Sequence, residues 1–186
     1  ADSPWTRRPE SGTIVTMNET DKSLLAMAVA RARTSRDDGN HPFGAVLADG
    51  DGRVLLDSGN TVPVDGDCTG HAETNLARAA SKAYARDFLR SCTLYSSAEP
   101  CAMCAGAIYW SGIGRVVYTL SEAELRGITG DDPENPTLDL PCREVFARGQ
   151  RTVAVEGPVD VPGAAAVHDG FWNPSAWEDG RTDRSS

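Results

Sequence analysis

The sequence contains few of the residues that mark several common classes of protein. It has 3 His and 5 Cys, and the odd number of Cys disfavours a framework of disulfides. No apolar run approaches the roughly 18 residues of a membrane-spanning helix. The first residues, ADSPWTRRPESG, have no apolar core of the kind found in signal peptides. We therefore expect a soluble, cytoplasmic protein with no membrane partner.

Basic residues are also scarce relative to acidic ones. There are 18 Lys and Arg against 27 Asp and Glu, which leaves a formal net charge of -9. Such a protein repels a polyanion at long range unless basic residues gather locally, so we expect no nucleic acid partner. Scattered Arg residues usually form solvated surface, and this is the expectation for the four candidates for binding a phosphate, Arg126, Arg143, Arg148 and Arg151.

The length of 186 residues is sufficient for one domain with its own hydrophobic core. We predict a flexible arm over residues 1–19, a single domain over residues 20–168 and a tail over residues 169–186. Aromatic side chains in the tail are candidates for packing on the domain's own surface. These are Phe171, Trp172 and Trp177.

Hydrophobic periodicity divides the domain into alternating strands and helices. Helices are predicted over Thr20–Ser35, Ala72–Ala83, Cys101–Trp110, Ser121–Ile128, Cys142–Ala147 and Val161–Val167. Strands are predicted at Phe43–Ala48, Val54–Leu56, Thr93–Ser97, Arg115–Leu120 and Thr152–Val155. The first two strands flank Asp-Gly turn residues and form a hairpin. Two segments dense in Gly, Pro and Asp are predicted to be loops, residues 60–70 and 129–141.

This alternation is typical of an α/β protein in which helices cover both faces of one sheet. A hairpin followed by crossover units indicates a mixed sheet, and we therefore predict a three-layer α/β/α sandwich. The sequences GHAETNLARAA (residues 70–80) and EPCAMCAGAIYW (residues 99–110) both fall where a predicted helix begins. Junctions between strands and helices are where α/β folds usually bind ligands.

Three residues in these two segments have the composition of a metal site. Cys101 and Cys104 are three apart on one helical face, so that both sulfur atoms can reach one point, and His71 begins another predicted helix. Sulfur and imidazole ligands favour zinc over magnesium or calcium. Three protein ligands leave a fourth position open, which is the geometry of a catalytic zinc site.

Glu73, two residues from His71, is the candidate proton acceptor for a water held at the open position. The implied chemistry is hydrolytic attack on a polarised carbon. Two alternatives remain open. A fourth protein ligand would make the site structural, and Cys68 is the best candidate for it. A redox-active C-x-x-C is less favoured because no thioredoxin-like sequence surrounds it. The expected free thiols are Cys68, Cys92 and Cys142.

The pattern His71-Ala-Glu73, followed by Pro-Cys101-x-x-Cys104, resembles the zinc-dependent cytidine deaminase superfamily. The similarity extends to HPFGAVL, SGN and EPCAMCAGAIYWSGIGRVVY, and it is greatest to bacterial guanine deaminases and tRNA adenosine deaminases. The resemblance implies a mixed five-stranded sheet and a zinc ion held by the His and the two Cys. It also implies that Glu73 passes protons from zinc-activated water to a ring nitrogen and to the departing ammonia.

The same resemblance implies a set of residues around the substrate. Asn60 is expected to hydrogen-bond the base, although Asn is also a common turn residue. The main-chain N–H of Ala72 is expected to meet a base carbonyl. An acidic residue of the loop after the fourth strand, Asp131 or Asp132, is expected to pair with the amidine edge of guanine. The remaining residues expected at the pocket are Phe43, Gly44, Ala45 and Trp110.

These features predict a homodimeric enzyme of purine metabolism that deaminates a free base or nucleoside of the guanine type. Cytosine or cytidine, adenine or adenosine, and tRNA adenosine are the alternative substrates, and the net charge of -9 argues against tRNA. A zinc-stabilised binding module without catalysis is the alternative from another class. The segments NPTLDLPCREVFARGQ and HDGFWNPSAW depart from guanine deaminases. In those enzymes a C-terminal segment often completes a neighbour's active site, so the resemblance also implies that Phe171, Trp172 and Trp177 are candidates for a lid over the active site of the same or a neighbouring subunit. His41 and His168 match no motif and are expected to be surface or supporting residues.

Overall fold

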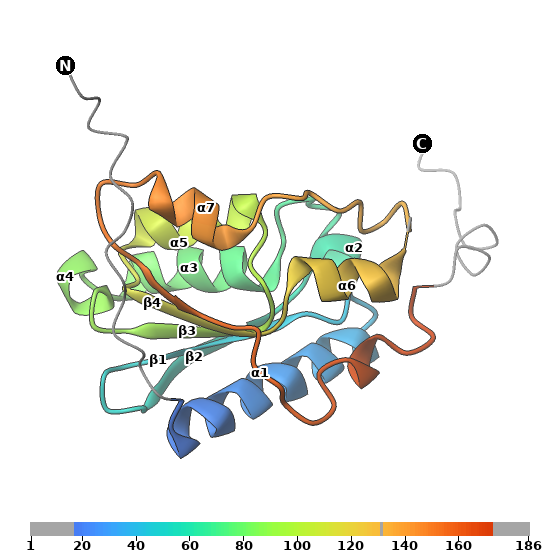
Figure 1. The fold of residues 1–186 in the computed structure, drawn as a ribbon, viewed down its shortest axis with the longest axis horizontal. Coiled ribbons are helices and arrows are strands. Elements are labelled where there is room, and N and C mark those ends of the chain that lie inside the picture. Colours follow the sequence, from blue (N-terminus) through green and yellow to red (C-terminus); the bar gives the residue numbers. More distant parts are fainter. Residues whose placement is uncertain (1–16, 131, 173–186) are drawn as a thin grey trace.

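The computed structural model describes residues 17–130 and 132–172, which build one mixed five-stranded sheet with helices on both faces (Figure 1). The strand order is β2-β1-β3-β4-β5. The strands are β1 (Gly44–Ala48), β2 (Val54–Gly59), β3 (Thr93–Ala98), β4 (Arg115–Leu120) and β5 (Ala154–Glu156). The predicted α/β architecture is confirmed.

The pairing of the strands places the predicted metal site at one edge of the sheet. Strand β1 pairs antiparallel with β2 and β3, whereas β3, β4 and β5 run parallel. The β1–β2 hairpin closes at an Asp-Gly turn, in which the Asp49 carboxylate accepts from the N–H groups of Asp51 and Arg53. Because β3 and β4 are parallel, the turns that follow them lie at the same edge. The turn after β3 leads to Cys101.

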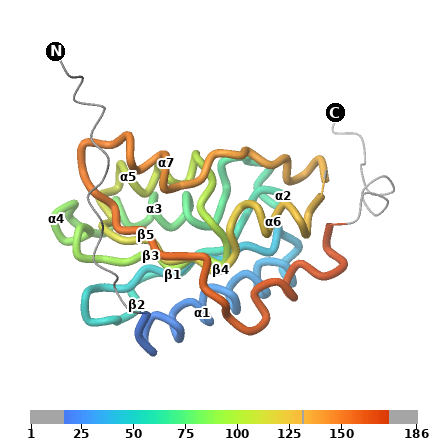
Figure 2. Tube along the Cα trace, viewed as in Figure 1, coloured from blue at the N-terminus to red at the C-terminus, as the bar shows by residue number. Residues whose placement is uncertain are grey.

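Helices enclose the sheet in two layers (Figures 1 and 2). One face is covered by α1 (Glu19–Asp37). The other face is covered by α3 (Ala72–Ala83), α5 (Ala102–Ser111) and α7 (Cys142–Ala147). Shorter elements are α2 (Val62–Asp65), α4 (Arg86–Leu89), α6 (Glu122–Thr129) and the 3-10 helix η2 (Ala166–His168). None of the helices in the described part of the chain is long and apolar enough to cross a membrane.

Three elements differ from the sequence predictions. The predicted loop 60–70 contains the short helix α2. Pro63 lies in the first turn of this helix, where proline is favoured. Periodicity does not detect α4, because a single helical turn shows no repeat. The predicted helix Val161–Val167 is wrong: this segment forms turns and η2, because Pro162 lacks an N–H and Gly163 has a φ of 85°.

Strand β1 shows how the sheet divides the hydrophobic core. All five of its residues are buried, and successive side chains point to opposite faces. Ala45 and Leu47 belong to the core cluster under α3 and α5, whereas Val46 and Ala48 belong to the cluster under α1. A strand covered on both faces is apolar throughout, as the sequence GAVLA is.

Gly44 marks the closest approach of α1 to the sheet. A Cβ atom at this position would lie 2.4 Å from the main-chain nitrogen of Ala32 and 2.5 Å from the main-chain oxygen of Ala28. Only glycine fits so close to another backbone. The Gly44 N–H donates to Ser97 Oγ at 3.0 Å. Gly44 therefore faces α1, and its predicted place in the substrate pocket stays a prediction.

A buried ion pair joins α1 to three strands. Asp21 in α1 is 2% exposed, and its carboxylate accepts two hydrogen bonds from the Arg115 guanidinium in β4, at 2.8 and 3.0 Å. The Tyr95 hydroxyl in β3 donates to the same carboxylate at 2.7 Å, and Arg115 Nε donates to Glu156 in β5 at 2.8 Å. Burial acts to raise the pKa of Asp21, but the hydrogen bonds from Arg115 and Tyr95 outweigh it, and the pKa is lowered.

We expect Arg115→Met to lower the free energy of unfolding by about 3 kcal/mol at pH 7, because the Asp21 carboxylate stays buried without its partner. The double variant Asp21→Leu/Arg115→Met should recover most of the loss. Because folding lowers the pKa of Asp21, its contribution is present at neutral pH and is lost as the pH falls below the ordinary value of 3.8. Urea unfolding at pH 7 and at about pH 3 measures both effects. Equal losses from the single and double variants would contradict the expected coupling.

Candidate metal centre

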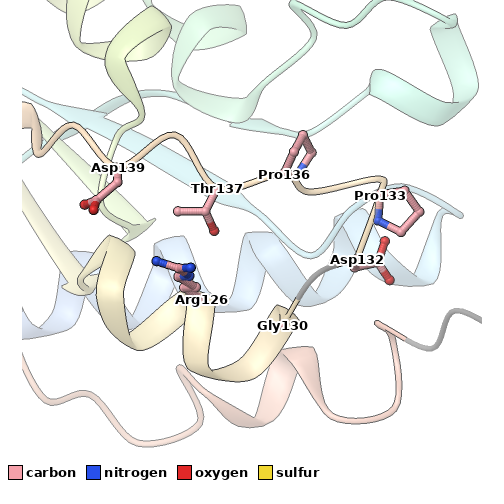
Figure 3. A pocket seen from close by; sticks show the side chains of 7 residues that line it. All are labelled: Arg126, Gly130, Asp132, Pro133, Pro136, Thr137 and Asp139. Atoms are coloured by element: carbon pink, nitrogen blue, oxygen red, sulfur yellow. The ribbon is translucent and has the colours of Figure 1, made fainter.

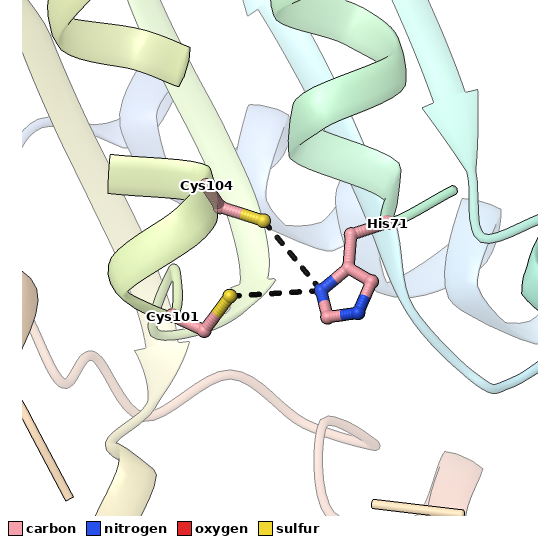
Figure 4. Close-up of side chains that lie close together, drawn as sticks. All are labelled: His71, Cys101 and Cys104. Carbon is pink, nitrogen blue, oxygen red and sulfur yellow. Dashed lines mark hydrogen bonds between the residues drawn. The ribbon is translucent and has the colours of Figure 1, made fainter. Parts of the chain in front are cut away.

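His71, Cys101 and Cys104 meet where α3 and α5 begin (Figure 4). His71 and Cys101 are the N-cap residues of these helices, and neither side chain caps its own helix. Cys104 lies in the first turn of α5. His71 Nδ1 is 3.6 Å from each sulfur atom, and the three candidate ligand atoms lie within 4.8 Å of one another. The fold therefore brings together all three residues that the sequence predicts as ligands.

The electrostatics of these side chains suit a cation. A hydrogen bond from Cys104, aided by one from His71, holds the pKa of the Cys101 thiol at about 4 against the effect of burial. The same bond and burial raise the pKa of Cys104. The hydrogen bond with Cys101 raises the pKa of His71, although burial opposes it. The positive ends of two helix dipoles lie at the site and also favour a thiolate.

Glu73 lies in the first turn of α3 and is 5% exposed. Its Oε1 atom accepts a hydrogen bond from Ser96 Oγ at 2.6 Å, and its Oε2 atom lies 3.4 Å from Cys104 Sγ. Burial raises the pKa of Glu73, with the Ser96 hydrogen bond acting in the opposite direction. A buried carboxyl group with a raised pKa, held next to a metal ligand, is suited to proton transfer near neutral pH.

Several supporting residues carry no motif of their own, so no signal in the sequence indicates them. The Asn75 side chain donates to the main-chain oxygens of Gly59 at 3.2 Å and Gly70 at 3.1 Å, which fixes the loop before His71. Thr74 Oγ1 lies 3.3 Å from Cys104 Sγ. Together with the Ser96 hydroxyl, these contacts orient the ligands and Glu73 in the way that outer residues orient metal sites generally.

Glu99 ties the Cys101 turn to two further helices. Its carboxylate accepts from the N–H of Glu122 at the start of α6, at 3.1 Å, and from the N–H of Cys142 at the start of α7, at 2.9 Å. The half-buried Glu122 side chain lies near the site, where burial and then the charge of Cys101 raise its pKa to about 7. The sequence signal for Glu99 is its position directly before Pro100 and Cys101.

The remaining cysteines do not join the metal centre. Cys68 is exposed, whereas Cys92 and Cys142 are buried, and all three are free thiols as predicted. Within the described ranges, the candidate ligand cluster consists of the His and the two Cys of Figure 4. Cys68 supplies no fourth ligand, so the alternative of a closed structural site has no support.

Asn60 and Ala72, two of the predicted substrate-binding residues, lie at the two ends of the segment around His71. Asn60 precedes the loop that leads to His71, and Ala72 directly follows it. Asn60 is 2% exposed. Its side-chain oxygen accepts a hydrogen bond from the N–H of Val62 at 2.9 Å, which is the contact expected of an Asn that stabilises a turn. Its side-chain NH₂ group makes no hydrogen bond to the described residues. The N–H of Ala72 is at the first position of α3, where a helix supplies no acceptor. Both N–H donors are therefore available to a ligand.

Ala45 and Phe43 lie at the same end of β1. Ala45 pairs with Ser96, whose hydroxyl donates to Glu73, so this part of β1 adjoins the buried carboxylate. The main-chain oxygen of Phe43 accepts from the N–H of Asn60 at 3.1 Å. Phe43 is half-buried and packs against the core cluster that contains Ala45. The fold thus brings three of the predicted pocket residues together.

Trp110 and Asp132 have contrasting surroundings. Trp110 is 71% exposed in the last turn of α5, six residues after Cys104, which is about 9 Å along a helix, so the chain does not bring it to the metal ligands. Asp132 is 2% exposed. Its Oδ1 atom accepts from the N–H of Glu134 at 2.9 Å, and its Oδ2 atom has no partner among the described residues. The alternative residue, Asp131, lies outside the described residues.

Phe171 and Trp172 form an aromatic strap that packs on this domain. The Trp172 ring lies 5.4 Å from the His41 ring, and its Nε1–H donates to His168 Nδ1 at 3.0 Å. His41 and His168 are 3% and 1% exposed. Of the two expectations for these His residues, surface or supporting, the surface position is therefore wrong. Trp177, the third aromatic residue of the predicted tail, lies outside the described residues.

A cleft of about 430 Å³ lies between α6 and the loop that follows it (Figure 3). Its lining residues are Arg126, Gly130, Asp132, Pro133, Pro136, Thr137 and Asp139. Neither a metal-site residue nor Glu73 is among them, so the metal centre does not line this cleft.

The donor set fits zinc. Two sulfur atoms and one imidazole nitrogen lie close enough together to share one ion, and the depressed pKa of Cys101 supplies the thiolate that such an ion needs. Three protein ligands beside a buried carboxyl group define the class of zinc-dependent hydrolases.

Comparison with known families makes the class more specific. Residues 18–120 match the model of the cytidine and deoxycytidylate deaminase zinc-binding region. The chain belongs to this family, and it is a zinc-binding, hydrolytic nucleobase or nucleoside deaminase. The resemblance and the cofactor predicted from the sequence are confirmed.

Curated relatives differ in their named substrates. A protein of Schizosaccharomyces pombe named "Probable cytosine deaminase" is 40% identical over 157 residues, which is 84% of this chain and 95% of that protein. The guanine deaminase of Bacillus subtilis is 40% identical over 91 residues, 49% of this chain and 58% of that protein. The tRNA-specific adenosine deaminase of Agrobacterium fabrum is 39% identical over 95 residues, 51% of this chain and 62% of that protein.

A solved structure supports the fold. The guanine deaminase of Nitrosomonas europaea superimposes with a TM-score of 0.65 at 24% identity, over 79% of this chain and 81% of that protein. At this identity the likeness concerns the fold alone. The relatives together establish the deaminase reaction and leave the choice among guanine, cytosine and adenosine to other arguments.

Proposed function

We propose that the enzyme deaminates a free base, with guanine as the leading substrate and cytosine as the second. The observation that supports deamination is the buried Glu73 carboxyl group, which lies next to the three-ligand centre. The leading substrate is supported by Asp132, whose buried Oδ2 atom is left without a partner in the described part of the chain. A buried carboxylate oxygen needs a donor, and guanine offers ring and amine N–H groups.

In the proposed mechanism Glu73 moves the protons. A zinc ion held by His71, Cys101 and Cys104 would polarise a water molecule and lower its pKa. Glu73, whose own pKa is raised by burial, accepts a proton from the attacking water and passes it to a ring nitrogen. It then takes the second proton from the hydroxyl group newly formed on the ring carbon and passes it to the amine, which leaves as ammonia. The Ser96 hydroxyl holds Oε1 at 2.6 Å, which leaves Oε2 as the atom that exchanges the proton.

The proposed base is held by main-chain and side-chain N–H groups. The N–H of Ala72 donates to a carbonyl oxygen of the base, and the Asn60 side-chain NH₂ donates to a ring nitrogen. Ala45 and Phe43 form an apolar wall beside the ring. The support for these roles is that both N–H groups lack a partner in the described residues and that β1 adjoins Glu73.

Three features favour a free base over a nucleotide or tRNA. The Trp172 ring of the aromatic strap lies 5.9 Å from the Phe43 ring, so a sugar on a base held beside Phe43 would meet the strap. Arg143 donates to the main-chain oxygens of Val155 and Gly157, so its guanidinium is not free for a phosphate. The net charge of -9 also opposes a polyanion.

Cytosine is the second candidate because of the length of one match. The Schizosaccharomyces pombe relative aligns over 157 residues, whereas the guanine deaminase of Bacillus subtilis aligns over 91. An alignment of 157 of the 186 residues must extend into the segments after β4. The name of that relative therefore bears on the part of the chain that selects the substrate.

Ammonia release by the zinc-loaded protein tests the proposed function. The panel is guanine, guanosine, cytosine, cytidine, adenine and adenosine, with the Glu73→Ala protein as the blank. We expect turnover of guanine, at least about 10-fold slower turnover of guanosine because the strap restricts the sugar, and none of adenine. Turnover of cytosine alone would replace the leading substrate by the second. Turnover of adenine or adenosine alone would refute the proposal.

The predicted homodimer is also retained as a proposal. Trp110 and Met103 leave apolar surface exposed on α5, at 71% and 36%, and a contact with a second copy would cover it. The mass of the protein in solution, measured by light scattering, is the test, and a monomer at micromolar concentration would refute it. The cytoplasmic location stays a prediction.

A further inference from the structure

His41 has an unsatisfied polar atom in the interior. The residue is 3% exposed, and its Nε2 atom has no hydrogen-bond partner in the part of the chain that the structure describes. Asp132 Oδ2 shares both properties. Buried polar atoms are nearly always paired, so two such atoms in one neighbourhood point to a ligand that pairs with them.

Glu134 connects the two residues. Its N–H donates to Asp132 Oδ1 at 2.9 Å, and its Oε2 atom lies 3.9 Å from His41 Nε2. The Asp132 charge and the His71 charge both act on the pKa of His41, so both groups lie within electrostatic range of the imidazole. Figure 3 shows the Asp132 carboxylate directed away from Arg126.

The His41 ring is held rigidly. Ser35 Oγ donates at 3.0 Å to the main-chain oxygens of both His41 and Asn60, which fixes the His41 backbone to the predicted pocket. The rings of Phe171 and Trp172 contact the imidazole at 6.0 and 5.4 Å. A side chain that is fixed on both sides can present one atom to a ligand in a constant position.

The protonation state of His41 follows from its surroundings. Burial, with a further contribution from His71, lowers the pKa of His41 to about 4, so the imidazole is neutral at pH 7. A neutral imidazole carries one proton, and the nearby carboxylates of Glu134 and Asp132 favour that proton on Nε2. The site therefore presents an N–H donor next to a carboxylate acceptor.

We propose that His41 Nε2–H is a second group that binds the substrate. It acts beside Asp132, whose pairing with a ring N–H the resemblance to guanine deaminases already implies, and the two bind a cyclic amide edge in which a ring N–H stands beside a C=O. The imidazole donates to the carbonyl oxygen and the carboxylate accepts from the ring N–H. Guanine has this edge at N1–H and C6=O, and cytosine has it at N1–H and C2=O. Adenine has no carbonyl, and cytidine carries its sugar on N1. The inference rests on the proposed function and makes its selectivity specific.

Kinetics with matched substrates test this inference. 2-Aminopurine keeps the amine of guanine but lacks both N1–H and C6=O, and 4-aminopyrimidine stands in the same relation to cytosine. We expect the unmodified enzyme to prefer guanine over 2-aminopurine by at least about 100-fold in kcat/KM. His41→Phe keeps the ring contacts but removes the donor, and it should reduce this preference about 10-fold or more through slower guanine turnover. His41→Gln, which retains an N–H donor, should restore part of the preference.

His168→Gln is the matched control. His168 belongs to the same aromatic cluster but contacts Trp172 through Nδ1, so its replacement loosens the strap. It should lower kcat/KM for guanine and 2-aminopurine by the same factor. The inference is overturned, while the proposed function stands, if His41→Phe leaves the preference for guanine over 2-aminopurine unchanged. It is also overturned if His168→Gln reduces that preference as much as His41→Phe does. If the unmodified enzyme turns over neither guanine nor cytosine, the proposed function fails, and the inference fails with it.

Discussion

Glu73→Ala is expected to lower kcat by about 10³-fold and to leave the zinc content unchanged. The expected loss is the usual contribution of a positioned acid or base. Zinc is retained because Glu73 contacts Cys104 but is not one of the three clustered ligand residues. Ammonia release with the best substrate gives kcat, and atomic absorption gives the zinc content per chain.

Two further variants separate proton transfer from packing around Glu73. Glu73→Gln preserves the size of the side chain and should be about as inactive as Glu73→Ala. Ser96→Ala removes the 2.6 Å hydrogen bond to Oε1 but keeps the carboxyl group, and it should cost about 10-fold in kcat. Because that hydrogen bond opposes the rise in the pKa of Glu73, Ser96→Ala should move the acidic limb of the pH profile to higher pH. Full activity in Glu73→Gln would instead contradict the proton-transfer role of Glu73.

Cys101→Ala is expected to abolish both zinc binding and turnover. The loss of one thiolate leaves two protein ligands, which is too few for a stable zinc site, and activity should fall by at least about 10³-fold. The melting temperature should also fall, because metal bound only by the native state stabilises it. Chelation of the unmodified protein should reproduce both effects, and added zinc should reverse them.

Cys68→Ala is the matched control for the metal site. Cys68 lies close to His71 in sequence, yet it is exposed and stands outside the candidate ligand cluster. Its replacement should leave the zinc content and kcat unchanged within about 2-fold, as expected for an exposed residue. Loss of zinc in this variant would show that Cys68 is a fourth ligand, and the site would then be structural.

The metal centre was predictable because each part of it is local. Cys101 and Cys104 are placed by one turn of α5, and His71 and Glu73 by the start of α3. The two helices then only have to begin near each other. They do so because each one follows a strand whose carboxyl end lies at the same edge of the sheet. The hydrophobic periodicity that predicts those helices also predicts the strands, so the layers follow from the same signal.

The substrate side was less predictable because its residues come from distant segments. Asn60 was found by resemblance, but its turn contact with Val62 became visible only in the fold. His41 matches no motif, and nothing in its sequence context indicates that Nε2 is buried without a partner. Gly44 was assigned to the pocket, whereas its contact with α1 depends on how closely a helix packs on the sheet.

The sequence by itself determined the chemistry of this protein: a three-ligand zinc site with an adjacent carboxyl group, carried at two helix starts of an α/β sandwich. The tertiary structure decided which buried polar atoms have no partner among the described residues, including His41 Nε2 and Asp132 Oδ2. The physical reason is that ligand spacing is set within one helical turn, whereas burial and hydrogen-bond pairing depend on packing between segments far apart in the chain.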